Sequence, residues 1–318
     1  METFRWAYVG CGSIAAKTAR EITSGAHLIA AVYSRNREKA AAFAKSCGAV
    51  CFDSMEELLA FGQFDAVYIA TPHTSHVRYA VAAMLAGYPT LCEKPAGVSA
   101  DEAELLIAAA RDRNVYFCEA MWTWFSDVAL QVRQWISDGR VGEIKKVRME
   151  YSFPGLLLGR ESRLLRPETA GGVLLDVGVY PIAYCLRLFG YPEEIRCRGK
   201  LRGGVDVSET VTLRYRGFDC VLKASLTRMR DRCEIRGAKG VIRVPSFFAA
   251  DRARLKTAEG KEIFRGRTDY RTEFTRVAEE IRRGEKESAY VPLELTRDCL
   301  RVADECRRQL GLVYPFEK

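Results

Sequence analysis

The chain has 318 residues, of which 48% are hydrophobic and 28% are charged, and its formal net charge is +8. That length exceeds what one ordinary hydrophobic core supports and predicts two domains, and the composition is typical of a soluble globular protein. We find no apolar run of about 18 residues and no leader-like N-terminal pattern, so the sequence predicts a cytoplasmic protein without a membrane partner.

The usage of cysteine, histidine and arginine excludes further classes of site. The eleven cysteines form no Cys-x-x-Cys pair and there are three histidines, so we expect reduced core cysteines and no metal. Arginines gather at residues 160–166 and at Arg228–Arg232, without the interleaved aromatic residues of a nucleic-acid site. We interpret these clusters as a solvated face or the rim of a site for an anionic ligand, and we expect no nucleic-acid partner.

Short apolar runs alternate with helical patterns through the first 120 residues. The predicted strands are Phe4–Val9, Leu28–Tyr33, Ala66–Ala70, Thr90–Cys92 and Val115–Ala120. The predicted helices are Ala15–Thr23, Arg37–Cys47, Met55–Phe61, His76–Ala86 and Asp101–Arg113. This alternation is typical of the α/β class and predicts a doubly wound parallel sheet, a Rossmann domain, over residues 1–120.

The pattern changes after Met121. A helix is predicted at Val128–Ile136, followed by strands at Lys146–Phe153, Thr210–Tyr215, Cys220–Leu226, Cys233–Arg236 and Gly240–Val244. Further helices are predicted at Arg271–Arg283 and Leu293–Leu310. Because consecutive strands joined by short turns form antiparallel sheets, we predict a C-terminal α+β domain over residues 121–318, with a mostly antiparallel sheet.

A glycine-rich turn follows the first predicted strand and opens the first predicted helix. Gly10 permits the tight turn, Gly12 lets the backbone approach a pyrophosphate, and Ala15 permits close packing of helix on strand. Ser13 and Ile14 lie at the helix N-terminus, which would face the phosphates. The pattern predicts a dinucleotide-binding site, and its alternative is a glycine-rich turn without a ligand.

The end of the second strand indicates which dinucleotide binds. Sites that prefer NAD carry an acidic residue there, about 20 residues beyond the glycines. Here Ser34 and Arg35 take that place, and the first carboxylate is Glu38. A hydroxyl and a guanidinium suit a 2′-phosphate, so the sequence favours NADP(H) over NAD(H). The alternative is that Arg35 and Arg37 are surface residues at a helix start.

Two polar segments follow the next predicted strands. Glu93 and Lys94 end one strand at the carboxyl edge where doubly wound sheets bind ligands. Thr71, Pro72 and His76 follow the preceding strand, so their loop should line the same cleft. We expect all five residues to contact the cofactor, although His76 could also be an exposed residue at a helix start.

A carboxylate and a phenol lie close together near the middle of the chain. The segment Gly171–Tyr180 reads Gly-Gly-Val-Leu-Leu-Asp-Val-Gly-Val-Tyr, so Asp176 and Tyr180 would share one face of a helical turn. Pro181 should kink or restart the helix and so aim the phenol into a cleft. The alternative is that Tyr180 is an ordinary core residue.

These motifs together resemble the Gfo/Idh/MocA family of oxidoreductases along essentially the whole chain. The resemblance rests on the glycine turn, on Glu-Lys-Pro at residues 93–95 and on Gly-Gly-x-x-x-Asp-x-Gly-x-Tyr. The segment Glu119–Thr123 and the tyrosine at position 180 are similar to the dimeric dihydrodiol dehydrogenases and NADP-dependent D-xylose dehydrogenases. Residues 124–127, Trp-Phe-Ser-Asp, depart from the Arg-Phe-x-Pro of that subgroup.

The resemblance implies an NADP(H)-dependent dehydrogenase or reductase that acts on the CH–OH group of a sugar, polyol or cyclic diol. It implies that Tyr180 is the general acid/base and that Lys94 favours the phenolate and binds the substrate oxygen. Asp176 would orient the lysine or a substrate hydroxyl. The alternative is a catalytically silent NADP(H)-binding sensor or regulatory subunit, which would need none of these three residues.

The resemblance also implies a substrate pocket and an assembly. We expect Trp122, Trp124, Phe153 and Tyr180 to line the substrate pocket, and Arg163 to be one of the cofactor contacts. The alternative is that the aromatic residues are core residues at a domain interface. The large, open-faced sheet of the C-terminal domain would form the interface of a homodimer or homotetramer.

Overall fold

The computed structural model describes residues 2–23, 25–159 and 161–317, so Arg160 of the arginine-rich segment lies outside the described residues. The chain forms two compact units. The first comprises the chain up to Gly97, Asp101–Met121 and Asp269–Glu294, and the second comprises Val98–Ala100, Trp122–Thr268 and the chain from Leu295 onward. The first unit therefore extends beyond residues 1–120 and takes in a late segment of the chain.

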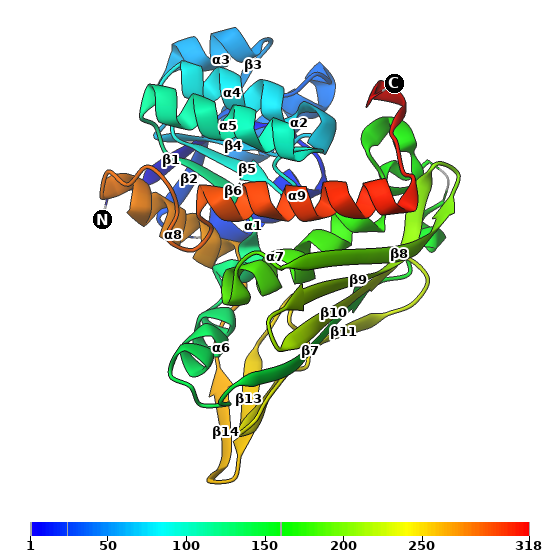
Figure 1. The fold of residues 1–318 in the computed structure, drawn as a ribbon. Helices are drawn as coiled ribbons and strands as arrows, with labels where there is room; N and C mark the ends of the chain where they lie inside the picture. The colour runs from blue at the N-terminus through cyan, green and yellow to red at the C-terminus, as the bar shows by residue number, and fades with distance from the viewer. Residues whose placement is uncertain (1, 24, 160, 318) are drawn as a thin grey trace. The chain divides into compact units, whose positions relative to one another are not determined.

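The first unit contains the predicted parallel sheet, with one strand more than the sequence pattern indicated. Its strands are β1 (Phe4–Val9), β2 (His27–Tyr33), β3 (Val50–Phe52), β4 (Ala66–Ile69), β5 (Thr90–Glu93) and β6 (Phe117–Ala120). Their order, β3-β2-β1-β4-β5-β6, is that of a doubly wound dinucleotide-binding sheet (Figure 1). The short strand β3 was missed because it has no buried residue and so no apolar run.

The helices of the first unit begin and end close to their predicted positions. They are α1 (Ser13–Ile22), α2 (Arg37–Cys47), α3 (Met55–Phe61), α4 (His76–Leu85), α5 (Ala100–Arg113) and α8 (Tyr270–Arg282), with a 3-10 turn η1 (His73–Ser75) before α4. Local capping explains two of these starts. The Ser54 hydroxyl accepts the Glu57 N–H at 3.1 Å, and the Asn36 side chain accepts the Lys39 N–H at 2.9 Å.

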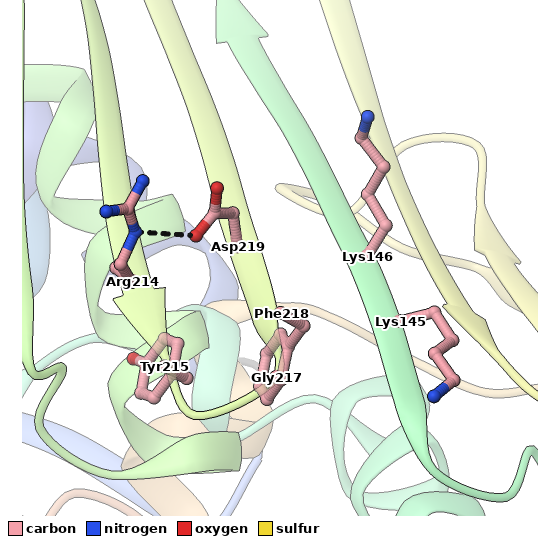
Figure 2. Close-up of a pocket in the computed structure, with 7 residues that line it drawn as sticks. All are labelled: Lys145, Lys146, Arg214, Tyr215, Gly217, Phe218 and Asp219. Carbon is pink, nitrogen blue, oxygen red and sulfur yellow. Dashed lines mark hydrogen bonds and ion pairs between the residues drawn. The ribbon is translucent and has the colours of Figure 1, made fainter.

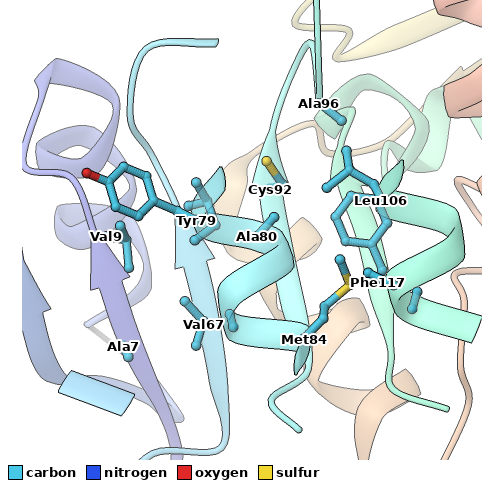
Figure 3. Close-up of a cluster of buried hydrophobic side chains, with 14 of the residues drawn as sticks. Ala7, Val9, Val67, Tyr79, Ala80, Met84, Cys92, Ala96, Leu106 and Phe117 are labelled. Carbon is cyan, nitrogen blue, oxygen red and sulfur yellow. The ribbon is translucent and has the colours of Figure 1, made fainter. Parts of the chain in front are cut away.

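A hydrophobic core packs against one face of this sheet. Val67, Cys92 and Phe117 of the strands are fully buried in it, and Figure 3 shows Ala80 of α4 and Leu106 of α5 in the same cluster. Every residue of β4, β5 and β6 is buried. Burial on both faces explains why these strands appear in the sequence as continuous apolar runs rather than alternating patterns.

Helix α8 packs against the other face of the sheet. Alternate residues of β1 point to opposite faces, so this strand contributes side chains to both sides of the sheet. Phe274 of α8 contacts Trp6 and Tyr8 of β1 and Tyr68 of β4, with ring centroids 4.8, 6.4 and 5.0 Å apart. The same helix contacts α1. This aromatic packing explains why a segment that follows the second sheet in the sequence returns to the first unit.

The second unit is built on a second sheet, which has eight strands. These are β7 (Ile144–Ser152), β8 (Glu194–Arg202), β9 (Val205–Tyr215), β10 (Phe218–Ser225), β11 (Arg230–Gly237), β12 (Gly240–Val244), β13 (Arg252–Thr257) and β14 (Gly260–Arg265). Their order is β14-β13-β12-β11-β7-β10-β9-β8, with β7 and β10 parallel and the other neighbours antiparallel. The predicted fold, a parallel Rossmann sheet followed by a mostly antiparallel α+β domain, is confirmed.

Three strands of this sheet were not predicted. Strands β8 and β14 have no buried residue, and β13 has two. In β8 and β14 both faces carry exposed or partly exposed side chains, so no hydrophobic alternation marks these two strands in the sequence.

One face of the second sheet is covered by helices. Helix α6 (Asp127–Ser137) contacts β13 and β14, and α7 (Val179–Phe189) contacts β7 and β10. The last helix is α9 (Leu293–Leu310). Short helical turns lie between and after these elements. They are the π-helical turn η6 (Leu174–Gly178) and the 3-10 turns η2 (Trp122–Trp124), η3 (Gly155–Leu158), η4 (Arg163–Leu165), η5 (Pro167–Thr169) and η7 (Pro315–Glu317).

One helical stretch of the second unit, Pro167–Phe189, is long and apolar enough to cross a membrane, with a mean hydropathy of 1.5. We expected no apolar run of this length from the sequence. In the structure, 78% of this window is buried inside the protein, as in the core helix of a soluble protein. Its composition is therefore weak support for a membrane span.

Candidate active site

The glycine turn after β1 has the close backbone approaches that a dinucleotide site needs. Gly10 has a φ of +101°, and a Cβ there would lie 2.5 Å from the carbonyl oxygen of Ala70. Only glycine fits this position. A Cβ on Gly12 would meet no described atom within 4 Å, and no side chain caps the N-terminus of α1 there. The backbone N–H groups near Ser13 and Ile14 could therefore bind a phosphate.

The residues after β2 lie beside this turn. The Gly10 N–H donates to the Tyr33 carbonyl oxygen at 2.8 Å, which brings the end of β2 next to the glycine turn. Ser34 is half-buried, and Arg35 is exposed and forms no ion pair with any described residue. Arg37, by contrast, binds Asp53 through an Nε–Oδ1 ion pair of 2.9 Å. Of the two arginines, Arg35 is the better placed for an anionic ligand.

His76 joins the loops that follow β4 and β5. Its ring is buried, with Nδ1 2.8 Å from the Pro95 carbonyl oxygen and Nε2 2.6 Å from the Thr71 carbonyl oxygen. These contacts hold the Thr71–Pro72 loop against the segment that contains Lys94. His76 is therefore not an exposed residue at a helix start, and it positions this strand edge; its contact with a cofactor stays a prediction.

Glu93 and Lys94 lie at the carboxyl end of β5. The Glu93 carboxylate is buried, and the Tyr68 hydroxyl donates to its Oε1 at 2.6 Å. Glu273 of α8 is fully buried nearby, where burial and the charge of Glu93 raise its pKa well above the usual range. Lys94 is partly exposed, and the Lys94–Pro95 peptide bond is cis.

In the second unit, Asp176 lies in the π-helical turn η6 and is paired with Arg163. Nη2 of Arg163 donates to Oδ1 of Asp176 at 2.8 Å, and the Asp176 side chain is 15% exposed. The arginine loop approaches closely because Gly171 has no side chain, since a Cβ there would lie 2.6 Å from the Arg163 carbonyl oxygen. Arg163, which we expected to contact a cofactor, thus binds the proposed catalytic carboxylate.

Tyr180 lies in α7 among aromatic side chains and is 5% exposed. Its ring centroid is 4.9 Å from Phe248 and 5.9 Å from Tyr151, edge-to-face in both cases, and the last two rings stack at 4.2 Å. Pro181 falls in the first turn of α7, which continues directly from η6, and it has no N–H to donate to the preceding turn. The predicted break in the helix takes the form of a change from π-helical to α-helical geometry.

The two tryptophans predicted to line the pocket differ in their surroundings. The Trp122 ring lies 4.9 Å from Phe248 and so joins the aromatic cluster around Tyr180. Trp124 is fully buried, donates from Nε1 to the Ala183 carbonyl oxygen at 3.2 Å, and stacks on Tyr184. Trp124 is a core residue in this structure, so our pocket proposal does not include it.

Phe153, the third aromatic residue, is half-buried and belongs to the same hydrophobic cluster as Tyr151. It packs against buried residues that include Leu164, Val173 and Leu226. Within the described residues, no ring contact joins it to Tyr180. The aromatic wall that we propose for the pocket therefore consists of Trp122, Tyr180 and the residues that contact them.

Sequence reasoning missed three residues of this cluster, Tyr151, Asp231 and Phe248. Tyr151 pairs with Asp231 across β7 and β11, and Oδ1 of Asp231 lies 3.4 Å from the Phe248 N–H that donates to it. Burial raises the pKa of Asp231 to about 6, and burial with the charges of Asp231 and Asp176 raises the pKa of Tyr151. The alternating pattern at 146–153 could have marked Tyr151 as inward-facing, but no local signal marks Phe248.

A surface cavity of about 420 Å³ lies elsewhere in the second unit, near the hairpin between β9 and β10 (Figure 2). It is lined by Lys145, Lys146, Arg214, Tyr215, Gly217, Phe218 and Asp219, none of which is a predicted site residue. Arg214 is paired there with Asp219 at 3.4 Å and with Glu194 at 2.9 Å. We assign this cavity no function. Among the described residues, no group of three His, Cys, Asp or Glu side chains is placed to hold a metal ion.

Comparison with known proteins agrees with this architecture. Residues 4–120 match the model of the oxidoreductase family with an NAD-binding Rossmann fold, and residues 129–243 match the GFO/IDH/MocA C-terminal domain. The chain is 31% identical to a scyllo-inositol 2-dehydrogenase (NADP(+)) from Bacillus subtilis, with 99% of each chain covered. It is 30% identical to the trans-1,2-dihydrobenzene-1,2-diol dehydrogenase of Mus musculus, again over 99% of each chain.

The likeness extends to solved structures. The aldose-aldose oxidoreductase of Caulobacter crescentus matches with a TM-score of 0.88 at 19% identity, over 98% of each chain, which supports the fold. The matched models, the full-length relatives and the order of the two sheets agree with the resemblance found in the motifs. The chain therefore belongs to the Gfo/Idh/MocA family of NAD(P)-dependent oxidoreductases.

Proposed function

We propose that the protein interconverts a secondary alcohol and a carbonyl on a sugar, polyol or cyclic diol, with NADP(H) as its preferred cofactor. The observation that carries this proposal is the Asp176–Tyr180 segment, in which an Arg163-paired carboxylate precedes a phenol set among aromatic rings. Aromatic side chains suit the apolar faces of ring compounds, and a few polar groups fix their orientation. The names of the relatives, an inositol dehydrogenase and a dihydrodiol dehydrogenase, support this substrate class.

The proposed chemistry divides among three residues. Bound NADP(H) would supply or accept the hydride, and Tyr180 transfers the proton of the alcohol oxygen. A phenol ionises poorly near neutral pH, and a neighbouring ammonium group favours the phenolate. Lys94 is proposed to supply that positive charge and to bind the substrate oxygen. Asp176 orients the lysine or a substrate hydroxyl and transfers no proton itself.

The first unit has residues that fit the dinucleotide. The open space at Gly12 and the uncapped N-terminus of α1 fit the pyrophosphate. Ser34 and Arg35 are proposed to bind the 2′-phosphate, because Arg35 is exposed and the segment after β2 has no carboxylate before Glu38. The loop of Thr71 and Pro72, together with Glu93, is proposed to border the remainder of the cofactor.

A turnover assay tests the proposal directly. Purified protein would be supplied with NADP⁺ or NAD⁺ and a panel of inositols, pentoses, hexoses and cyclic diols, with formation of the reduced nicotinamide followed by absorbance. We expect at least one substrate to be oxidised, faster with NADP⁺ than with NAD⁺. Tight NADP(H) binding without turnover of any substrate would instead support the sensor or regulatory subunit. Tighter binding of NAD⁺ than of NADP⁺ would contradict the cofactor preference.

We also propose that the protein is a cytoplasmic homodimer or homotetramer that associates through the sheet of the second unit. The exposed strand faces of that sheet carry the residues that a partner copy would contact. Sedimentation analysis of the purified protein gives the number of copies, and a monomer at micromolar concentration would contradict this proposal.

A further inference from the structure

Two buried carboxylates of β9, Asp206 and Glu209, lie behind the segment that carries Asp176 and Tyr180. Their exposed fractions are 0% and 5%. Oδ1 of Asp206 and Oε2 of Glu209 have no hydrogen-bond partner among the described residues. Burying carboxyl groups with incomplete hydrogen bonding costs free energy. The contacts that the two groups make indicate which role in the structure offsets that cost.

Each carboxylate contacts one end of the π-helical turn η6. Oδ2 of Asp206 accepts the backbone N–H of Leu174 at 2.7 Å, at the start of the turn. A Cβ on Gly172 would collide with Oδ1 of Asp206, and a Cβ on Gly178 would collide with Oε1 of Glu209. The two glycines therefore allow the turn to rest directly on the two carboxylates.

The supported turn is an uncommon structure that determines the direction of the proposed catalytic groups. A π-helical turn is rare within α-helices and is found frequently at functional sites. Asp176 lies inside this turn, and Tyr180 follows in the first turn of α7. The Tyr314 hydroxyl adds a third contact, because it donates to the Gly171 carbonyl oxygen at 3.1 Å just before the turn.

We propose that Asp206 and Glu209 are positioning residues that hold Asp176 and Tyr180 in the arrangement that the reaction requires. The inference rests on the proposed function, because it assigns these two carboxylates a part in that reaction. They contact the backbone of the turn rather than a substrate or cofactor. Their effect is therefore on the direction of the carboxylate and the phenol.

The charge of the pair gives this support a pH dependence. Burial and the charge of Asp206 raise the pKa of Glu209 well above the usual range. Burial also raises the pKa of Asp206, to about 6, against the opposing effects of backbone N–H groups and of Arg307. Asp206 is thus ionised at pH 7.5 and gains a proton as the pH falls through about 6.

Other titratable groups face the pair from the elements packed around it. Arg307 and Cys306 belong to α9, Cys197 belongs to β8, and Tyr314 follows α9. Glu317 pairs with Arg307. Among these groups, Asp206 is the one that accepts a hydrogen bond from the turn and has a pKa of about 6. Asp231 of the aromatic cluster also has a pKa of about 6, so the part of a rate change that belongs to Asp206 is the part that an Asp206 variant removes.

The test compares two substitutions of one residue with a matched control. Asp206→Ala removes the acceptor of the Leu174 N–H, and we expect kcat to fall by about 10²-fold, as for a misplaced reactive group, with NADP(H) affinity unchanged. Asp206→Asn keeps an acceptor oxygen without the charge and so resembles the protonated acid, so its kcat at pH 7.5 should be lowered towards the value that the native protein has below pH 6, with no further change near pH 6. The control is Glu150→Gln, a buried carboxylate of β7 that binds Arg228 and Arg232 rather than the turn.

A second measurement does not depend on catalysis. Hydrogen exchange of the backbone amides in Leu174–Tyr180 should be faster in Asp206→Ala and in Glu209→Leu than in the native protein, and unchanged in Glu150→Gln. Native kcat, pH profile and exchange in the Asp206 and Glu209 variants would overturn the inference. If the native protein turned over no substrate while exchange still depended on Asp206, the proposed function would fail and the support of the turn would remain.

Discussion

The two units hold their proposed reactive groups by different physical means. In the first unit, Lys94 follows a parallel strand. Its segment is fixed by His76, whose two ring nitrogens contact two backbone carbonyl oxygens. In the second unit, Asp176 and Tyr180 belong to a helix that departs from α-helical geometry and rests on side chains of β9. A strand edge presents side chains by topology alone, whereas a distorted helical turn needs support from residues distant in the sequence.

Both units nevertheless place a pair of buried carboxyl groups behind the proposed reactive residues. In the first unit these are Glu93, which accepts from Tyr68, and Glu273 of α8. In the second unit they are Asp206 and Glu209, and Asp206 accepts from a backbone N–H of the turn. The donors differ: a side-chain hydroxyl fixes a strand end, and a backbone amide fixes a turn. Substitution of the proposed reactive residues in either unit should therefore lower the activity of the protein. The accompanying change in its free energy of unfolding depends on the contacts that hold the substituted residue.

The largest expected effect is the fall in kcat when the proposed reactive residue of one unit, Lys94 or Tyr180, is replaced. Lys94→Ala should lower kcat at least as much as Tyr180→Phe, because the lysine is proposed both to favour the phenolate and to bind the substrate oxygen. Steady-state kinetics of the two single variants and the double variant would measure this. If the losses multiply instead of overlapping, the two residues act independently and the proposed partnership is wrong.

Tyr180→Phe alone should lower turnover by about 10²–10⁴-fold, the usual contribution of a general acid or base, with NADP(H) affinity nearly unchanged. The phenylalanine keeps the ring contacts with Tyr151 and Phe248, so stability should change little. Turnover is compared at several pH values with a deuterated substrate, to verify that hydride transfer limits the rate. A rate near the native value under that condition would rule out the assignment.

The two tryptophans offer a comparison of core and pocket inside the second unit. Trp124→Ala should lower the free energy of unfolding by about 3–5 kcal/mol, because it leaves a large cavity in the core. Trp122→Ala should instead raise the KM for substrate. Chemical denaturation and kinetics measure the two effects. A Trp122→Ala variant that is strongly destabilised but has an unchanged KM would show that Trp122 is also a core residue.

Cofactor preference is tested with two neighbouring arginines. Arg35→Ala should weaken NADP⁺ binding by about 10–100-fold, as expected for the loss of a charge-assisted contact, and leave NAD⁺ binding unchanged. Arg37→Ala is the matched control, because Arg37 already pairs with Asp53. Dissociation constants from fluorescence titration decide the result, and equal losses in both variants would indicate a general charge effect. Ser34→Asp should move the preference towards NAD(H).

The smallest effect concerns pH and stability at Asp231. Its pKa is raised by burial to about 6 in the folded protein, above the unfolded value of about 3.9, so folding is favoured more as the pH falls from about 6 to about 4. Asp231→Asn should remove this contribution, which partial solvent exposure keeps below about 1 kcal/mol. Denaturation midpoints of both proteins at pH 5 and pH 7.5 measure the difference, and an identical pH dependence would contradict the assignment.

The sequence determined the parts of this protein that depend on local signals. Residues near one another in the chain specify the turn at Gly10, with its positive φ, and the helix start at Ser54, whose hydroxyl accepts the Glu57 N–H. Alternation of strands and helices predicted that Lys94 follows a strand of a parallel sheet. Topology then places such ends at one edge. The family motifs specified which residues to examine.

The tertiary structure decided which distant residues meet. No local pattern shows that α8 packs on β1, that Arg163 binds Asp176 or that Asp206 accepts the Leu174 N–H. Strands β8 and β14 escaped prediction because neither has a buried residue. Trp124 reads like Trp122 in the sequence, but Trp122 contacts Phe248 whereas Trp124 stacks on Tyr184. Side-chain surroundings depend on packing between elements far apart in the chain, and a local pattern records only which face of an element is apolar.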